Sequence, residues 1–155
     1  MNKLITDDPR HKERIVKTLK FIAEELNKQN ITWLLGASGA LMVWGVEIVP
    51  YDLDIFTSKE SVEKLSKVFS DDVINPLHNF NEKGNDFLEF QMMINEVEVE
   101  ICELDFSPDG LRKIDFNGTL VPVNPLENDL QLYRARQGKE KVVALIEKRL
   151  MEINK

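Results

Sequence analysis

The stretch LLGASGALMVWGVEIVPYDLDIF, residues 34–56, decides the fold of this chain. An apolar run over 31–35 predicts a buried strand, which small residues interrupt at 36–39. The segment 40–45 is too apolar to be exposed. It predicts a short buried helix that ends on glycine, the residue that favours a helix C-terminus. A second strand is expected over 51–56. Two strands joined by a buried helix predict a sheet with helices packed on it.

The remaining segments continue this mixture of helices and strands. Asp8 and Pro9 are typical of a helix start. Apolar residues at helical spacing predict a helix to about Asn30 whose buried face is formed by Ile15, Leu19, Phe21, Ile22 and Leu26. Thr57 and Glu60 form a capping box for the next helix. Further strands are expected over 73–80 (broken at Pro76), over 87–94 and 97–104 with a tight turn at 95–96, and in a hairpin around 117–118. Helices are expected over 124–136, where Asn124 is a candidate N-cap, and over 139–153. Strands that alternate with helices at first and cluster later predict an α/β (α+β) fold, a mixed β-sheet flanked by helices, as a single domain over residues 1–155.

Composition narrows the function classes. The 155 residues contain 43% hydrophobic and 30% charged residues, an ordinary globular balance. No apolar run is long enough for a membrane span, the N-terminus has no signal-peptide core, and the one cysteine excludes an internal disulfide. We therefore expect a cytoplasmic protein without a membrane partner. The net charge of −7 argues against nucleic acid as the main partner.

Charges cluster along the chain. Acidic residues crowd the middle of the sequence, and basic residues crowd the last quarter, at Arg134, Arg136, Lys139, Lys141, Lys148 and Arg149. An acidic centre beside a basic segment could hold metal and phosphate together. The alternative interpretation is two solvated faces, which charge clustering alone favours.

The sharpest local feature is the pair Asp52 and Asp54. Side chains two residues apart on a strand point to the same face, so these carboxylates should lie side by side, with Leu53 and Ile55 facing the core. A divalent cation would relieve their repulsion and prefers oxygen ligands. The alternative is an edge strand with a solvated acidic face, although aspartate is a poor strand residue.

The small residues Gly36, Ala37, Ser38 and Gly39 form a second candidate site. They lie between a strand and a helix, where small side chains let a ligand approach the backbone and free N–H groups favour an anion such as phosphate. A tight turn that uses small residues only for packing would show the same pattern. The turn lies 13 to 18 residues before the aspartate pair, and the two together favour a nucleotide site.

A third candidate is the alternating segment 96–101, in which Glu96, Glu98 and Glu100 share one face of the expected strand. One of these carboxylates could join the aspartate pair as a metal ligand or a general base. The pattern alone favours a half-exposed strand of alternating polarity.

Taken together, these motifs resemble the DNA polymerase beta-type nucleotidyltransferase superfamily. The resemblance is carried by LLGASGAL at 34–41, by WG at 44–45 and by DLDI at 52–55, with Glu100 where such proteins carry a third carboxylate. The segment VPVNPLENDL, residues 121–130, resembles the strand and helix that close many small members. Among these are the bacterial lincosamide- and aminoglycoside-modifying enzymes and the minimal nucleotidyltransferases of toxin–antitoxin pairs.

The resemblance implies the nucleotidyltransferase fold and a role for each candidate residue. Asp52 and Asp54 would bind Mg²⁺, with two ions accommodated, and Gly36 to Gly39 would hold a nucleoside triphosphate. Glu100 would complete the metal site or activate the acceptor, with Glu98 as its competitor. A nucleoside monophosphate would pass to a hydroxyl of a small molecule or a protein, the acceptor being unknown.

A second function stays open beside this enzyme. A catalytically silent relative could bind a partner protein, as an antitoxin-like or regulatory subunit, or form a homo-oligomer. An acidic α/β domain without a nucleotide role is a third reading, and nucleotide binding in the presence of Mg²⁺ separates it from the first.

Overall fold

The computed structural model describes residues 8–155, and helices and strands alternate along them as the sequence predicts. The α-helices are α1 Pro9–Lys28, α2 Ala37–Val43, α3 Lys59–Val68, α4 Leu126–Arg134 and α5 Glu140–Ile153. The strands are β1 Trp33–Gly36, β2 Leu53–Thr57, β3 Val73–Glu82, β4 Asn85–Ile94, β5 Val97–Glu103, β6 Arg112–Phe116 and β7 Thr119–Val123. No helix within this part of the chain is long and apolar enough to cross a membrane.

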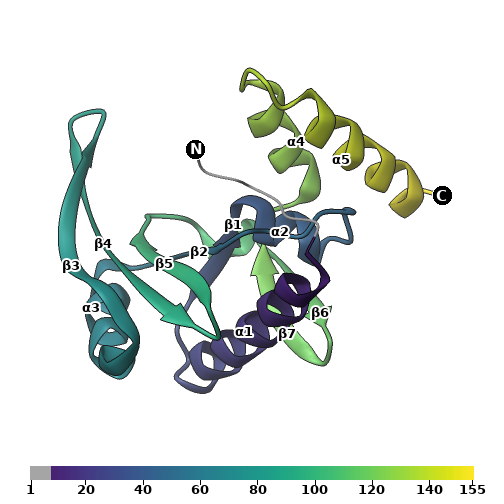
Figure 1. Ribbon diagram of the computed structural model, residues 1–155. Helices are drawn as coiled ribbons and strands as arrows, with labels where there is room; N and C mark the ends of the chain where they lie inside the picture. Colours follow the sequence, from purple (N-terminus) through teal and green to yellow (C-terminus); the bar gives the residue numbers. More distant parts are fainter. Residues whose placement is uncertain (1–7) are drawn as a thin grey trace.

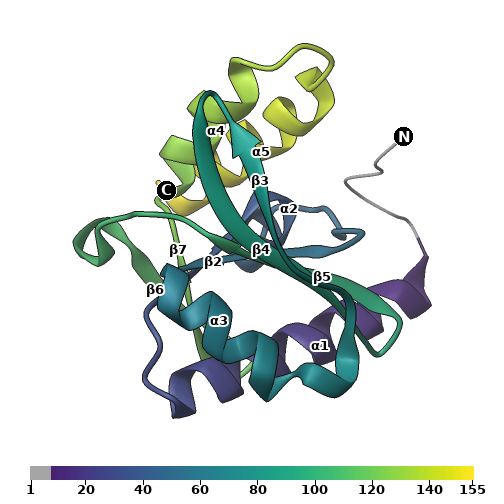
Figure 2. The ribbon, with the colours of Figure 1, turned by 90° about the vertical axis from the view of Figure 1, so that its left-hand side faces the viewer.

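The strands form one mixed sheet in the order β3-β4-β5-β2-β1-β7-β6. β2 pairs with β5 in parallel and with β1 antiparallel, and β7 pairs with β1 in parallel. Helices α1 and α3 cover one face of this sheet, whereas α4 and α5 rise on the other side (Figure 1). The β3–β4 hairpin rises on that side too, over the other end of the sheet (Figure 1). The view turned by 90° again shows α1 and α3 below the sheet and α4 and α5 above it (Figure 2). The α/β (α+β) class with a mixed, helix-flanked sheet is therefore confirmed.

The core lies between the sheet and helices α1 and α3. Leu53 and Ile55 of β2 are fully buried, as are Val99 and Ile101 of β5. Their neighbours along each strand point to the opposite face, so burial alternates every two residues along β2 and over Val97–Ile101 of β5. A second apolar cluster joins α2 to α4 and α5 through residues such as Leu41. The two clusters hold α2 between the sheet and the C-terminal helices.

The tight turns follow the residues that favour left-handed backbone. Asn95 and Glu96 join β4 to β5 with φ values of 53° and 64°, and Asn117 and Gly118 join β6 to β7 with 51° and 89°. Both hairpins are confirmed, because two successive residues with positive φ match the twist of the flanking strands. The 73–82 segment is a strand with register shifts on both sides of Asn75, near the break expected at Pro76.

Three local expectations are wrong for identifiable reasons. The cap of α3 is Ser58, which accepts a hydrogen bond from the Ser61 N–H at 3.2 Å, because Thr57 still belongs to β2. Asn124 does not cap α4, whose preceding residue is Pro125 and which has no side-chain cap. Phe21, expected in the core, is 49% exposed, because α1 turns Thr18 and Ala23 inward instead.

Candidate functional site

The face of the sheet turned away from α1 and α3 carries the predicted carboxylates. Asp54 lies within β2 and is half-buried, while Asp52 lies immediately before the strand rather than on it. The Tyr51 carbonyl next to it is 2.8 Å from a ring nitrogen of His11, whose ring also stacks on Tyr51. The entry to β2 is thus held by α1.

Strand register places Asp54 in a row of residues across four strands, three of which are polar. Asp54 pairs with Gly36 of β1 on one side and with Glu100 of β5 on the other, and Glu100 pairs with Gln91 of β4. Residues opposite each other in a sheet share a face, so Asp54 and Glu100 lie side by side. Glu98 is exposed beyond this row, and Glu96 lies in the β4–β5 turn, where it forms an ion pair with Arg14 at 3.1 Å. Glu96 therefore does not share the face of Glu100, as the alternation had suggested.

The carboxylates of this row repel one another in a partly buried setting. Burial raises the pKa of Asp54 to about 6, helped by the charges of Asp52, Glu98 and Glu89. Burial raises the pKa of Glu100 to about 7, with a hydrogen bond and charge from Glu89 next and Asp54 after it. Burial and Glu98 also raise the pKa of Asp52. Raised values on neighbouring acids mean that a bound cation would stabilise the site.

Sequence reasoning missed Glu89, which lies opposite Cys102 on the same face as Glu100. Its carboxylate is 2.8 Å from His78 Nε2, and His78 Nδ1 lies 2.8 Å from the Pro76 carbonyl oxygen. These contacts raise the pKa of His78, the carbonyl first and Glu89 second. The signal existed in the alternation of Glu89 and Gln91 along β4, but only the β4–β5 register brings them to the site.

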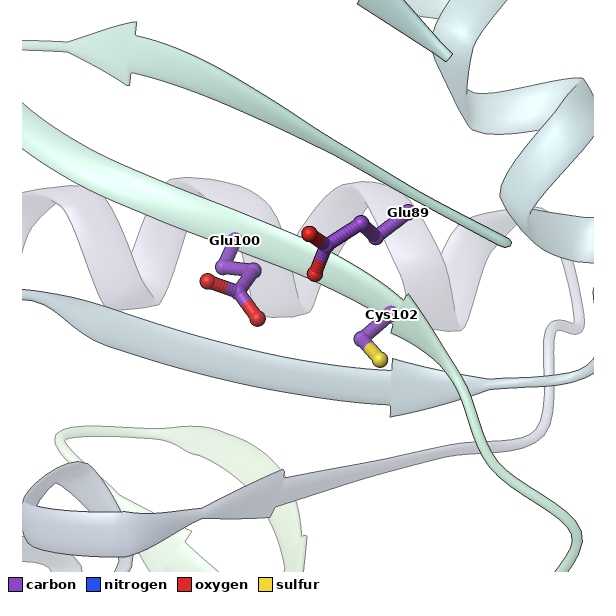
Figure 3. A group of neighbouring side chains, drawn as sticks. All are labelled: Glu89, Glu100 and Cys102. Carbon is purple, nitrogen blue, oxygen red and sulfur yellow. The ribbon is translucent and has the colours of Figure 1, made fainter. Parts of the chain in front are cut away.

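Glu89, Glu100 and Cys102 point toward one another (Figure 3). Among residues 8–155 this is the set whose ligand atoms all lie within 4.8 Å, and Asp52, Asp54 and Glu100 do not form such a group. Burial raises the pKa of the Cys102 thiol to about 12, so the sulfur stays protonated and suits a hard cation poorly. The carboxylates, rather than the thiol, are the groups that fit Mg²⁺.

The small-residue turn is tighter than the sequence suggests. β1 ends at Gly36 and α2 begins at once at Ala37, whose φ of 51° lies in the left-handed region that glycine normally occupies. A Cβ on Gly36 would lie 2.6 Å from Phe56 Cε2, and a Cβ on Gly39 would lie 3.2 Å from Leu35 and Leu53 side chains. The glycines therefore serve close packing of β1, β2 and α2, next to Asp54.

Two buried polar atoms near this turn have no hydrogen-bond partner within the described residues: Ser38 Oγ and Asp129 Oδ2. Ser38 is 1% exposed, so its hydroxyl faces the interior and the anion-binding role that we predict for the turn rests on its backbone. Asp129 lies on α4, which contacts α2.

Helix α4 brings two further residues toward the site. Burial raises the pKa of Tyr133; the nearby Arg136 guanidinium lowers it, and the carboxylates of Asp129 and Asp54 raise it again. Tyr133 therefore lies within the electrostatic reach of Asp54. No local sequence signal marks this neighbourhood, because about seventy positions separate the end of β2 from the start of α4.

Asp129→Asn should stabilise the protein at alkaline pH. Burial raises the pKa of Asp129 to about 7 from 3.8, so the folded state binds this proton more tightly than the unfolded state does. The stability from this group is complete below about pH 4 and is lost as pH rises to about 7. We expect the variant to gain about 1–3 kcal/mol at pH 8 and nothing at pH 4, measured by urea unfolding at both pH values. An equal effect at both would contradict a buried, titrating carboxyl.

Several basic residues of the C-terminal quarter are engaged in structure. Arg134 forms an ion pair with Glu147 at 3.1 Å, and Lys148 forms one with Glu47 at 3.5 Å. Arg149 Nε donates to the Trp44 carbonyl oxygen at 2.7 Å, which ties α5 to the end of α2. For these residues the structural interpretation is the better one. Arg136 is exposed and lies over the Tyr133 ring, 5.4 Å from its centroid.

Comparison with known proteins places this geometry in a known fold. No protein-family model matches the sequence, and no curated protein sequence matches it. A crystal structure of a "putative nucleotidyltransferase" from Thermotoga maritima superposes with a TM-score of 0.67 at 21% identity, covering 88% of this chain and 92% of that one. The lincomycin-bound lincosamide antibiotic adenylyltransferase LnuA superposes with a TM-score of 0.60 at 13% identity, covering 94% and 98%. The protein that these residues build has the nucleotidyltransferase fold.

Proposed function

We propose that this protein is a Mg²⁺-dependent nucleotidyltransferase that moves a nucleoside monophosphate from a nucleoside triphosphate to a hydroxyl group. The observation that carries the proposal is the register of Asp54 beside Glu100, with Asp52 at the entry to the same strand, on a nucleotidyltransferase fold. A reaction that consumes nucleoside triphosphate fits the cytoplasm, where we propose that the protein acts.

The donor set fits the metal that this function requires. Asp52, Asp54 and Glu100 offer oxygen ligands, and burial and mutual repulsion raise the pKa of each in the absence of a cation. These residues would hold one or two Mg²⁺ ions. Bound there, the metal would neutralise charge on the attacking and leaving oxygens of an in-line displacement.

Other residues of the chain would bind the triphosphate and accept the proton. Gly36 to Gly39 would hold the triphosphate at the start of α2 through backbone N–H groups. Glu100 would either complete the metal site or, with its pKa of about 7 in the metal-free protein, serve as the general base that accepts the proton of the acceptor hydroxyl. The acceptor oxygen then forms its bond to the α-phosphorus as the bond to the β-phosphate breaks, and pyrophosphate leaves.

A catalytically silent, partner-binding relative is the second candidate. Chain length bears on this alternative, because a short chain leaves little room for an acceptor domain. This chain covers 98% of LnuA, an adenylyltransferase, so length does not favour the silent relative. Association with a partner protein or with a second copy stays a prediction of that alternative.

The decisive experiment is thermal unfolding with each nucleoside triphosphate, with Mg²⁺ and with EDTA. A ligand at about 100 times its Kd adds about 2.7 kcal/mol, which for a chain of this size raises Tm by roughly 5–10 °C. We expect the shift to require Mg²⁺ and to persist in Asp109→Asn, which alters an exposed aspartate of the short 3₁₀ turn Pro108–Gly110. No shift with any nucleotide would favour the silent relative.

A further inference from the structure

Gln91 of β4 is a buried polar side chain on the sheet face that carries the carboxylates. It is 9% exposed and lies directly opposite Glu100 in the β4–β5 register. Residues opposite each other in an antiparallel pair have Cβ atoms about 5 Å apart, which is within reach of a side-chain hydrogen bond. A buried amide needs a partner for its oxygen and another for its nitrogen, so the two partners of Gln91 define what it can do.

The two ends of the Gln91 amide have different partners. Its oxygen Oε1 accepts a hydrogen bond from Asn75 Nδ2 at 2.6 Å. Burial and Glu89 raise the pKa of Glu100, whereas a side-chain hydrogen bond with Gln91 lowers it. A hydrogen bond that favours the charged carboxylate is one donated to it, so the amide nitrogen of Gln91 faces Glu100. Asn75, Gln91 and Glu100 thus form an amide relay, in which each amide donates toward the carboxylate.

The direction of the amide relay follows from the carboxylate at its end. An ionised carboxylate only accepts hydrogen bonds, so Gln91 must present its N–H group to Glu100 and its oxygen to β3. A donor on β3 then has to meet that oxygen, and Asn75 supplies it. If the Gln91 amide were flipped, its oxygen would lie against the carboxylate and repel it.

The backbone of β3 is irregular in a way that turns Asn75 toward the site. Val73 packs against the core and pairs with the buried Met92. Two residues later Asn75 pairs with Gln91, on the other face of the sheet. Strand residues two apart normally share a face, so the extra residue Ile74 reverses the alternation, as a β-bulge does. Ile74 itself is left 52% exposed.

A second register shift in β3 has the same result for His78. It lies between Asn75 and His78, and it places His78 opposite Glu89, 2.8 Å from the carboxylate. Leu77, within this irregularity, is 38% exposed. Each shift therefore leaves an apolar side chain in solvent and brings a polar one to the face of the carboxylates. Bulges beside active sites commonly re-aim side chains in this way.

We propose that Gln91 is a positioning residue that fixes the Glu100 carboxylate for cation binding, and that Asn75 acts on Glu100 only through Gln91. This role rests on the proposed function, with Glu100 as the third ligand of its Mg²⁺ site. The hydrogen bond from Gln91 restrains rotation of the carboxylate, so less freedom is lost when a cation binds. Hydrogen bonds to ligating carboxylates commonly tune metal affinity.

The first test measures cation affinity without nucleotide, so that it does not depend on turnover. The probe is Mn²⁺, which prefers the same oxygen ligands as Mg²⁺ and whose free-ion EPR signal falls as it binds. Gln91→Met keeps the length of the side chain and removes both polar ends. We expect it to weaken Mn²⁺ binding about 10- to 100-fold, and unchanged affinity would overturn the proposal.

A double-mutant cycle tests whether Asn75 acts through Gln91. Asn75 is exposed on an edge strand, so Asn75→Ala should leave the fold intact. We expect Asn75→Ala to weaken Mn²⁺ binding about two- to tenfold in the wild type and to have no further effect in Gln91→Met. Additive losses would mean that the two residues act independently, and would overturn the amide relay.

Asn75→Asp separates the amide relay from simple electrostatics, because the two predict opposite results. An added negative charge would by itself strengthen Mn²⁺ binding. A carboxylate at this position cannot donate to Gln91, so it attracts the Gln91 N–H group and leaves the amide oxygen facing Glu100. We expect binding to weaken about two- to tenfold, and tighter binding would overturn the proposal.

Asn79→Asp is the matched control for this charge. Asn79 is exposed on the same strand, but it pairs with Leu88 and so faces away from the carboxylates. It should bind Mn²⁺ no more weakly than the wild type does. An equal loss in Asn79→Asp and Asn75→Asp would overturn the proposal. Thermal unfolding in EDTA checks the fold of each variant, and if Gln91→Met does not fold, Asn75→Asp decides.

The outcomes distinguish this role from the proposed function. Mn²⁺ binding that is lost in Asp54→Asn but unchanged in Gln91→Met would overturn the role of Gln91 and leave the proposed metal site. A wild type that binds no Mn²⁺, with or without ATP, would overturn the proposed metal dependence and the role of Gln91 with it.

Discussion

Asp54→Asn is expected to lower the rate of nucleotidyl transfer on the order of 10³-fold, because it removes a metal-binding carboxylate from the centre of the site. The amide keeps the shape of the side chain and is half-buried in the same strand, so the fold should persist. The measurement is the initial rate of pyrophosphate release at saturating nucleotide and Mg²⁺. Activity within about tenfold of wild type in Asp54→Asn would remove Asp54 from the mechanism. The control variant Asp109→Asn should keep activity in that range.

The same substitution should stabilise the metal-free protein at neutral pH. The folded pKa of Asp54 is about 6 against 3.8 for the free side chain, so the stability from this group is present below about pH 4 and is lost as pH rises to about 6. We expect Asp54→Asn to raise Tm at pH 7.5 in EDTA by roughly 3–6 °C and to leave Tm at pH 4 unchanged. Mg²⁺ should narrow this difference by stabilising the wild type. A variant less stable than wild type at pH 7.5 would contradict the repulsion argument.

Glu100→Gln and Glu98→Gln should differ strongly in their effects on transfer. Glu100 pairs directly with Asp54 and its pKa of about 7 suits a base at neutral pH, whereas Glu98 is exposed and acts on the aspartates only through its charge. We expect Glu100→Gln to lower kcat about 10²- to 10⁴-fold, and Glu98→Gln to lower it by less than about tenfold.

The pH profile provides the control for this comparison. The wild-type rate should fall as the pH is lowered and Glu100 takes up its proton, and Glu98→Gln should keep that fall. Equal losses of kcat in the two variants would show that the charge of the cluster, rather than the position of Glu100, matters. A larger loss in Glu98→Gln would assign the third carboxylate to Glu98.

Local sequence was enough to predict most of the elements and the orientation of the side chains along β2. The alternation along β2 predicted that Leu53 and Ile55 would be buried and that Asp54 would face away from them, because the strand repeats every two residues without help from its neighbours. The hairpins at 95–96 and 117–118 were equally predictable, since their turn residues tolerate positive φ. The N-cap of α3 was not predictable from local sequence. Thr57 was expected to be the cap, but its pairing with Trp33 keeps it in β2, and Ser58 becomes the cap.

Only the tertiary structure decided which side chains share the site. The β2–β5 register places Glu100 opposite Asp54, and the β4–β5 register brings Glu89 and Gln91 to the same face. The placement of α4 brought Tyr133 within reach of the same carboxylates. Register and helix placement depend on contacts between segments far apart in the chain, and these contacts are set by burial of the whole core rather than by any local repeat. The sequence by itself thus determined a strand that carries Asp54 beside a small-residue turn, and the packed sheet placed Asp54 in a row with Glu100 and Gln91.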